Sequence, residues 1–342
     1  MAIFQSVLHI ILSTQISPFD LREVHQKNGL IAMVSIGVST VAVVPFIRRL
    51  AYEVCMKLHL SIGVFAVVMV WIHMKDRYGL NGKLLISAIG LLIISTMFYG
   101  ARELFRNITR SQVMTVAQRT PLAGAVRLDF TPPRPWEVHA GDYVYLRAPG
   151  VHPLSFAESH PFNIIWWDQD KSGRASRIQL ISRVHSGFTK DLSAIPHGSL
   201  RVLVDGPYGK ALNTRYWDNF LFVATDIGIS AQMPYLKELI DLQRHPRRLS
   251  RVSIIWVVED DQHRDWVTDE VQHLLDVDAA YMLFHWTTYS KTKIDTTYVA
   301  RRGRMVFGNP HMKTVLEEEF GKFSGNVLLS GETTATTYLN LS

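Results

Sequence analysis

Four long uncharged stretches in the first hundred residues constrain this chain more than any other feature of its sequence. They cover residues 1–19, 28–47, 58–74 and 84–101, and short segments that carry nearly all of the local charges separate them. Each is about 17–20 residues long, which is the length that an α-helix needs to cross the hydrocarbon core of a bilayer. We therefore expect a bundle of about four transmembrane helices within residues 1–110, with a lipid bilayer as its partner.

The first stretch starts abruptly at an apolar Met1. It lacks the basic start and the small-residue cleavage site of a signal peptide, and three similar stretches follow it. Its most apolar part, residues 1–12, would reach only about 18 Å as a helix, short of the roughly 30 Å hydrocarbon core. We expect either an incomplete first helix or the loss of an upstream part of the chain.

Charge also divides the chain into two parts. The whole sequence has 36 basic and 30 acidic residues, of which residues 1–110 contain 11 and 5. The excess positive charge thus belongs to the apolar third, so we expect a membrane as partner and no nucleic acid. The single cysteine, Cys55, excludes an internal disulfide and a cysteine-ligated zinc or iron–sulfur site within one chain.

Two histidines lie inside the third apolar stretch, where an ionisable side chain indicates a functional role. His59 and His73 are 14 residues apart, which is about 1400° of helical rotation and about 21 Å of rise. Both imidazoles should therefore face the same way, one near each membrane surface. Such a pair suits two stacked haem b groups. The alternative is two interfacial histidines that are solvated by lipid head groups.

The sequence has no second helix with a matching pair. The first stretch contains His9, and His25 follows in a segment that we expect to be a loop. His9 with His73 is the candidate ligand pair for the outer haem, whereas the partner of His59 at the inner haem is missing. Electron transfer across the membrane would then need a second chain that supplies this ligand.

From residue 111 to residue 212 the pattern changes to short β-rich runs between Pro and Gly residues. Such runs predict an antiparallel β-barrel. The expected strands are 124–130, 142–147, 162–167, 177–184 and 199–204.

Strands and helices alternate from residue 213 to residue 342, which predicts an α/β domain with a parallel sheet and a ligand at the carboxyl ends of its strands. The expected strands are 220–224, 252–258, 281–286 and 327–330, and the expected helices are 231–244 and 266–275. A barrel followed by a nucleotide-binding sheet is the layout of a flavin reductase module. Because this chemistry needs the cytosolic nucleotide pool, it fixes the orientation in the membrane, which the basic residues specify only weakly.

Motifs in both soluble parts resemble those of the fungal ferric reductase and NADPH oxidase family. His160-Pro161-Phe162-Asn163 resembles its His-Pro-Phe-Thr/Ser flavin motif, and Gly187-Phe188-Thr189 resembles its second flavin motif, which precedes a helix. The run from Gly206 and Pro207 to Gly209 resembles its Gly-Pro-Tyr-Gly turn, and Gly228-Ile229-Ser230 resembles its nucleotide loop. The alternative for any single motif is ordinary turn chemistry. The order of the motifs over nearly the whole chain is more specific.

The resemblance implies the fold of a ferredoxin reductase behind the membrane helices, and it implies FAD, NADPH and haem b as cofactors. It implies that Phe162 offers a stacking face to the flavin, and it singles out no catalytic side chain. The implied FAD ligands are His160, Pro161, Phe162, Asn163, Gly187, Phe188 and Thr189. The implied nicotinamide nucleotide ligands are Gly206, Pro207, Gly209, Gly228, Ile229, Ser230 and Gly331, and the implied haem iron ligands are His59, His73 and His9.

Two departures from the family pattern concern the nucleotide. Thr225 and Asp226 replace two glycines, so that a carboxylate would cap the following helix and occupy or repel the place of the pyrophosphate. Ser330, Gly331 and Glu332 replace Cys-Gly-Pro, and the chain stops soon afterwards. We therefore expect weakened NADPH binding. The mixed charges after residue 258 leave NADPH and NADH both open.

The expected function is electron transfer from NADPH through FAD and haem to a ferric chelate or another metal ion. The chain would be an integral protein of the plasma membrane with a cytosolic flavin domain. One alternative is an NADPH oxidase-like enzyme that makes superoxide from oxygen. The other is an inactive or shortened family member that keeps the fold without electron transfer.

Overall fold

The computed structural model describes most of the chain, and it divides the chain into two compact units, residues 1–100 and residues 101–342. Each unit is described by itself. The described residues are 4–5, 8–9, 11–12, 15, 20–50, 52–74, 79–109, 114–152, 155–196, 198–210, 212, 214–243, 249–278, 283–291 and 303–332.

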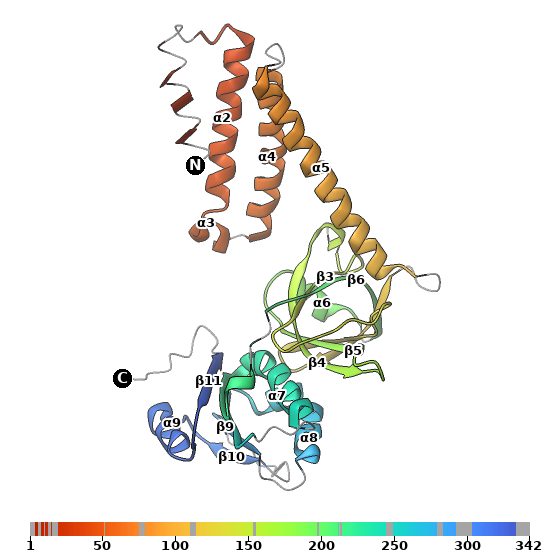
Figure 1. The fold of residues 1–342 in the computed structure, drawn as a ribbon, viewed down its shortest axis with the longest axis vertical. Coiled ribbons are helices and arrows are strands. Elements are labelled where there is room, and N and C mark those ends of the chain that lie inside the picture. The colour runs from red at the N-terminus through yellow and green to blue at the C-terminus, as the bar shows by residue number, and fades with distance from the viewer. Residues whose placement is uncertain are drawn as a thin grey trace. The chain divides into compact units, whose positions relative to one another are not determined.

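The first unit is helical, with α2 (Val24–Ala42), α3 (Pro45–Leu50), α4 (Tyr52–Met74) and the first part of α5 (Leu80–Asn107). Helices α2 and α4 lie side by side (Figure 1). Among the residues that the structure describes, two helical segments are long and apolar enough to cross a membrane, Val54–Met74 and Gly82–Asn107. The first expected stretch, residues 1–19, lies mostly outside the described residues.

The second expected stretch, residues 28–47, is not one continuous helix. Helix α2 ends at Ala42, and α3 begins at Pro45. Proline lacks an N–H and restricts the residue before it, so it is accepted in the first turn of a helix but ends a preceding one. Helix α2 also begins earlier than expected, at Val24. His25 therefore lies in its first turn and not in a loop, and that expectation is wrong.

Helix α5 has apolar side chains exposed on its surface. The exposed fractions are 68% for Leu91, 64% for Ile94 and 74% for Phe98. A helix that is apolar all round is buried either in a protein core or in a membrane. Because no protein layer covers these side chains in the described part of the chain, a bilayer is the environment that suits them.

The second unit begins with a closed barrel of six antiparallel strands. These are β1 (Thr115–Leu122), β2 (Ala125–Phe130), β3 (Tyr143–Arg147), β4 (His160–Gln169), β5 (Ala175–Arg183) and β6 (Gly198–Tyr208), joined in the order β1-β2-β5-β4-β3-β6. Closure removes the free strand edges on which other chains pair. The five expected strands and the antiparallel barrel are confirmed, and the sequence analysis missed β1.

A parallel sheet of five strands follows, in the order β10-β9-β8-β7-β11. Its strands are β7 (Asn219–Thr225), β8 (Arg251–Val258), β9 (Phe284–Ser290), β10 (Arg304–Phe307) and β11 (Val327–Glu332), and its helices are α7 (Ile229–Gln243), α8 (Thr268–Val277) and α9 (Met312–Phe320). Strands β7 and β8 are buried almost throughout, as expected for central parallel strands. The expected strands and helices are confirmed, with β9 displaced towards its C-terminus. Strand β10 and helix α9 were missed.

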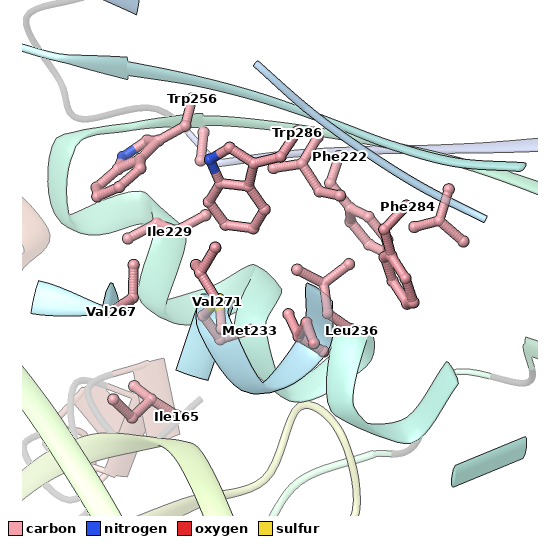
Figure 2. Close-up of a cluster of buried hydrophobic side chains, with 14 of the residues drawn as sticks. Ile165, Phe222, Ile229, Met233, Leu236, Trp256, Val267, Val271, Phe284 and Trp286 are labelled. Atoms are coloured by element: carbon pink, nitrogen blue, oxygen red, sulfur yellow. The ribbon is translucent and has the colours of Figure 1, made fainter. Parts of the chain in front are cut away.

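Helices α7 and α8 cover one face of this sheet. Figure 2 shows the indole rings of Trp256 and Trp286 between the strands and the helices, with Met233 and Leu236 of α7 beside them. Ile165 of barrel strand β4 belongs to the same buried cluster. Some barrel side chains therefore belong to the hydrophobic core of the sheet, whereas the interior of the barrel forms a separate core.

A buried ion pair adds a polar contact between barrel and sheet. The Arg127 Nη2 atom of β2 lies 3.1 Å from Glu270 Oε2 of α8 and donates to the carbonyl oxygen of Trp266 at 2.6 Å. The Trp266 indole N–H donates in turn to the carbonyl oxygen of Ala123 at 2.8 Å. Both charged side chains are buried, so the opposite charge of each partner is needed to offset the loss of hydration of the other.

We predict that Arg127→Met lowers the free energy of unfolding by about 3–5 kcal/mol, because it leaves the Glu270 carboxylate buried without its cation. Urea unfolding of the full chain in detergent, followed by tryptophan fluorescence, measures this change. The matched control is Arg177→Met, which removes an arginine that is half exposed and pairs with Asp129 at 3.0 Å. That control should cost at most about 1 kcal/mol. Equal losses in the two variants would contradict the prediction.

A second prediction concerns pH. Burial raises the pKa of Glu270 above its usual value although Arg127 opposes the shift. A carboxyl whose pKa is raised by folding stabilises the protein most below its unfolded pKa and loses that contribution as the pH rises through the folded pKa. The stability of the natural chain relative to Glu270→Gln should therefore fall as the pH rises above the ordinary pKa of a glutamate. Thermal unfolding of both proteins from acidic to neutral pH tests the sign.

Candidate functional site

The first flavin motif begins on strand β4. The His160 ring stacks on the Phe188 ring, with centroids 4.0 Å apart and planes at 16°. Behind it lies the buried carboxylate of Glu158, whose Oε2 atom is 3.6 Å from His160 Nε2 and 3.0 Å from His152 Nε2. The carboxylate and the stacked ring fix the place of the His160 imidazole at the barrel surface. Neither His152 nor Glu158 belongs to a motif that the sequence analysis used.

Phe162 does not offer a stacking face, which corrects that expectation. Its exposed fraction is 4%, and it packs in the barrel core with its ring edge towards Phe188. Side chains alternate along a strand, so Phe162 and Ile164 point inward whereas Pro161 and Asn163 are exposed. The outward residues of this motif are therefore Pro161 and Asn163.

The second flavin motif forms the expected turn before a helix. Gly187 has φ 73° and stands at the N-cap of α6 (Phe188–Ala194). Only glycine adopts this conformation without strain. The Thr189 hydroxyl oxygen accepts the His185 N–H at 2.9 Å, which leaves the hydroxyl proton available to a ligand. The backbone N–H groups of the first helical turn point out of the helix at its N-terminus, where they favour an anion.

The Gly-Pro-Tyr-Gly turn is packed against strand β3. A Cβ atom added to Gly206 would lie 2.9 Å from Val144 Cγ1, and one added to Gly209 would lie 2.5 Å from Asp142 Oδ1. Burial raises the pKa of Asp142, although its carboxylate accepts the His139 N–H. The two glycines are thus required by close packing at the end of β6, and Pro207 lies between them.

A polar cluster that the sequence analysis missed lies at the same turn. Arg102 of α5 places Nη2 2.8 Å from Asp205 Oδ1 and also donates to the Tyr208 hydroxyl, which donates to Asp205 Oδ2 at 2.6 Å. The Tyr208 ring lies 5.9 Å from Tyr143 and 5.7 Å from Tyr145. No spacing rule connects Arg102 to Asp205, because they are 103 residues apart in the sequence.

Asp226 departs from its expected role. It has φ 46° in the turn after β7, and its buried carboxylate accepts the Glu259 N–H at 2.9 Å and the His263 Nδ1–H at 3.0 Å. Arg183 of β5 lies 3.4 Å from the other carboxylate oxygen, and the Trp256 indole N–H donates to the Asp226 carbonyl oxygen. The carboxylate does not cap helix α7. It joins the ends of β7 and β8 to the barrel.

The remaining nucleotide residues lie where the parallel sheet places them. Gly228 ends the short turn η3 (Asp226–Gly228), and Ile229 and Ser230 begin α7 with buried side chains. Gly331 lies in strand β11 and pairs with Val223 in the neighbouring strand β7. Next to it, the Ser330 hydroxyl donates to Gln232 Oε1 on α7 at 3.0 Å. The loop and Gly331 therefore lie at the carboxyl ends of adjacent strands β7 and β11.

Comparison with known proteins agrees with this architecture. Residues 123–212 match the model of an FAD-binding domain family. Ferric reductase transmembrane component 3 of Saccharomyces cerevisiae is 22% identical over 227 residues, which cover 64% of this chain and 30% of that protein. Ferric/cupric reductase transmembrane component 2 of Schizosaccharomyces pombe is 23% identical over 317 residues, which cover 75% of this chain and 51% of that protein. The chain is thus similar to ferric reductase transmembrane components over much of its length, and its residues 123–212 match an FAD-binding domain. It spans between about a third and a half of the length of these relatives.

Solved structures resemble the soluble part. The cytochrome b5 reductase domain of Ulva prolifera nitrate reductase has a TM-score of 0.45 and 10% identity, and the match covers 67% of this chain and 90% of that domain. A ferredoxin NADP⁺ reductase from Neisseria gonorrhoeae has a TM-score of 0.40 and 12% identity, with 64% and 98% covered.

The chemistry of the barrel surface fits the FAD that the family model implies. An imidazole, a helical turn with outward N–H groups and the Thr189 hydroxyl converge where β4 meets α6, around the stacked pair of His160 and Phe188. Backbone N–H groups and hydroxyl donors are the groups that bind phosphates. These residues suit the pyrophosphate part of a dinucleotide.

The family resemblance implies haem iron, and the hydrogen bonds of two histidines on α4 are compatible with a role as its ligands. His59 Nδ1–H donates to the Ser39 carbonyl oxygen at 2.9 Å, and His73 Nδ1–H donates to the His25 carbonyl oxygen at 2.5 Å. Metal-ligating imidazoles usually make this contact, which holds the tautomer whose Nε2 lone pair is available. Both rings contact α2, so the expectation that they face the same way is confirmed.

The expected partners of these two histidines differ. The His9 ring lies 6.4 Å from the His73 ring, and the His25 ring lies 6.2 Å from it. His59 instead contacts Ser39. Among the described residues, the structure therefore brings together the proposed pair of His9 and His73, and it places a serine rather than a second imidazole beside His59.

We predict that Thr189→Val weakens FAD binding by about tenfold. Valine neither accepts the His185 N–H nor donates to a phosphate, and one hydrogen bond to a charged group contributes about this much. Thr189→Ser keeps the hydroxyl and should stay within about threefold of the natural chain. Titration of FAD into the apoprotein, followed by quenching of flavin fluorescence, gives both dissociation constants. Equal losses in the two variants would show that the hydroxyl contributes nothing.

Proposed function

We propose that this chain is a membrane oxidoreductase that transfers electrons from a reduced nicotinamide nucleotide, through FAD on the barrel and haem between the helices, to a ferric chelate or another metal ion. The observation that carries the proposal is the common unit formed by barrel and sheet, in which the end of barrel strand β5 is joined to the carboxyl end of β7 through Arg183 and Asp226. The names of the relatives support the metal acceptor.

FAD supplies the chemistry that no side chain offers, because it accepts a hydride as an electron pair and releases electrons singly. The chain binds and orients it. In the proposal, Gly187, Phe188 and Thr189 hold the pyrophosphate with N–H and hydroxyl donors, and His160 lies beside it on the Phe188 ring. The exposed Asn163 side chain donates a hydrogen bond at the rim of the barrel in place of the usual hydroxyl.

Rigidity of the module is the second contribution of the chain. Transfer between two bound cofactors requires their binding surfaces to keep a fixed separation. The shared core with Ile165 and the Arg127–Glu270 pair hold the barrel on the sheet. The contact of Arg183 with Asp226 and Glu259 then ties the flavin-side strand β5 to the nucleotide end of the sheet.

The membrane unit would carry the electrons onward. In the proposal His59 and His73 ligate haem iron through Nε2, with His9 as the second ligand beside His73 and with a ligand from a second chain beside His59. The Nδ1 contacts with backbone carbonyl oxygens support this assignment. The two long apolar helical segments support a membrane location, which we propose to be the plasma membrane with the flavin domain in the cytosol.

The family resemblance implies NADPH as the donor, and the departures at Thr225 and Asp226 imply weakened binding. We expect a dissociation constant for NADPH above the usual micromolar range.

The test is a visible spectrum of the full chain in detergent, supplied with FAD and haem, before and after a reduced nicotinamide nucleotide is added without oxygen. Bleaching of the flavin followed by reduced haem bands is the expected result. Adding ferric chelate or oxygen afterwards identifies the acceptor by the faster reoxidation. Bleaching without haem reduction would overturn the membrane relay, and no change at all would favour an inactive family member.

We predict that His59→Ala and His73→Ala each lower the haem bound per chain, because each removes an imidazole that would hold the haem iron. The control is His139→Ala, which changes an exposed histidine of the barrel region. Haem content by the pyridine haemochrome spectrum, with FAD content measured on the same sample, separates loss of a ligand from loss of folding. Unchanged haem content in both variants would mean that these histidines only join α4 to α2.

A further inference from the structure

We propose that Glu158 is a positioning residue for the flavin. Its buried carboxylate keeps a proton on the His160 imidazole, so that this ring is a cation for the FAD pyrophosphate and FAD binding takes up protons. The inference rests on the proposed function, because it concerns the FAD that the barrel would bind. It adds to the flavin motif two side chains from outside it, Glu158 and His152.

The segment before strand β4 holds the Glu158 carboxylate in place. The fully buried Ser155 hydroxyl donates to the Ala148 carbonyl oxygen at 2.7 Å and accepts the His152 N–H at 3.2 Å. The Glu158 N–H donates in turn to the Ser155 carbonyl oxygen at 3.4 Å. One buried serine thus joins His152 to Glu158 just before the flavin motif begins.

Two imidazoles share this carboxylate. Glu158 Oε2 lies 3.0 Å from His152 Nε2 and 3.6 Å from His160 Nε2, and the exposed fraction of the Glu158 side chain is 6%. Burial of a carboxylate costs free energy unless a cation offsets its charge. A protonated imidazole supplies that cation, so the three side chains hold a proton between them more firmly than an isolated histidine does.

The His160 ring contacts both the carboxylate and the second flavin motif. Its Nε2 atom is buried beside Glu158, whereas the side chain as a whole is 21% exposed and stacks on Phe188, the first residue of α6. Both nitrogens of an imidazolium share its positive charge, so protonation also favours an anion beside the first turn of α6. In the proposal the pyrophosphate lies there, and its charge decides that His160 rather than His152 carries the proton.

Strand β3 presents an apolar residue to this cluster. His160 pairs with Leu146, which is fully buried. Successive side chains of a strand point to opposite faces, so Tyr145 and Arg147 lie on the other face of β3. Arg147 is bound to Glu103 at 2.9 Å. The charges of β3 therefore do not supply the cation for the pyrophosphate.

Helix α6 and the segment before it contribute further titratable groups. Lys190 and Asp191 are exposed and adjacent, with opposite charges, and the exposed His185 precedes the Gly187 turn. Among ordinary side chains an imidazole is the one whose charge changes near neutral pH. His185 is therefore the group from which an experiment must distinguish His160. Pro153 and Leu154, which lie outside the described residues, carry no charge.

The experiment measures FAD binding to the apo form of the full chain in detergent between about pH 6 and about pH 8.5. Quenching of flavin fluorescence gives the dissociation constant at each pH, and calorimetry in two buffers of different ionisation enthalpy gives the protons taken up per FAD. The pyrophosphate diester of FAD stays a dianion over this range, so groups of the chain take up these protons. We expect the dissociation constant to rise about tenfold from the acidic to the alkaline end.

The variant Glu158→Gln removes the charge that favours the imidazolium and nearly keeps the shape of the side chain. Its pH profile should shift by about one unit towards acid, so that FAD binds about threefold more weakly near the alkaline end and almost normally near the acidic end. Loss of a purely structural contact would weaken binding equally at every pH. The matched control is Asp168→Asn, which removes the same charge from an exposed position of β4 and should leave the profile unchanged.

Three histidine variants identify the ring that takes up the proton. His160→Gln should abolish both the pH dependence and the proton uptake. His152→Gln keeps a donor to the Glu158 carboxylate, and His185→Gln changes the exposed imidazole before the turn. Both should retain the pH dependence.

The outcomes separate this inference from the proposed function. An unchanging dissociation constant across the pH range, or a pH dependence that His152→Gln or His185→Gln abolishes instead of His160→Gln, overturns the inference and leaves the FAD site intact. An equal loss at every pH in Glu158→Gln overturns it as well. If Glu158→Gln does not fold, the proton uptake of the natural chain and of His160→Gln decides. Failure of the natural chain to bind FAD at any pH overturns the proposed flavin site itself.

Discussion

The soluble module depends on the contact that fixes the barrel to the parallel sheet. In the proposed function each half binds part of a dinucleotide, and electron transfer between the two cofactors needs both surfaces at a constant separation. The hydrophobic part of the contact is the cluster that Ile165 of β4 shares with the helices on the sheet. The polar part is Arg127 with Glu270. Because the pair is buried, a mutation that removes either partner leaves the other charge unpaired in a poorly solvated place.

Asp226 shows how one substitution can change a nucleotide loop without breaking the fold. A left-handed backbone conformation favours glycine, and aspartate is among the few other residues that adopt it at moderate cost. Here the carboxylate accepts from Glu259 and His263 and faces Arg183, so the side chain is bound on every side that the structure describes. These contacts hold the negatively charged Asp226 carboxylate at the end of β7. A dinucleotide must therefore be bound without help from these donors.

Much of the fold followed from local patterns in the sequence. The apolar runs of β7 and β8 predicted central parallel strands because buried strands need no alternation, and the glycine of the Gly187 turn predicted a left-handed residue before a helix. Strand β10 has four residues and none of them is buried, so its sequence contains little periodic signal. Helix α9 does have an apolar face, but it spans only nine residues. Pro45 shows where the second apolar stretch divides into helices α2 and α3. The prediction missed this break because it was based on the length of the uncharged stretch.

The candidate site was predicted less completely, because side-chain direction depends on strand register and on distant partners. The motif that contains Phe162 was found, but its inward direction depends on the residue at which β4 begins. The mixed charges after β8 were visible in the sequence, whereas the burial of His263 against Trp266 and the pairing of Arg264 were not. The cluster of Arg102, Asp205 and Tyr208 had no local signal at all.

The membrane histidines illustrate how one geometry supports two explanations and where they diverge. Helical periodicity alone placed His59 and His73 on one face of α4, and that face contacts α2 at both positions. At His73 the approach is close enough that a Cβ atom on Gly29 would lie 2.8 Å from the ring. A purely structural histidine and a metal ligand both use Nδ1 to bind a backbone carbonyl oxygen. They differ only at Nε2, so occupancy of that nitrogen by iron decides between helix packing and electron transfer.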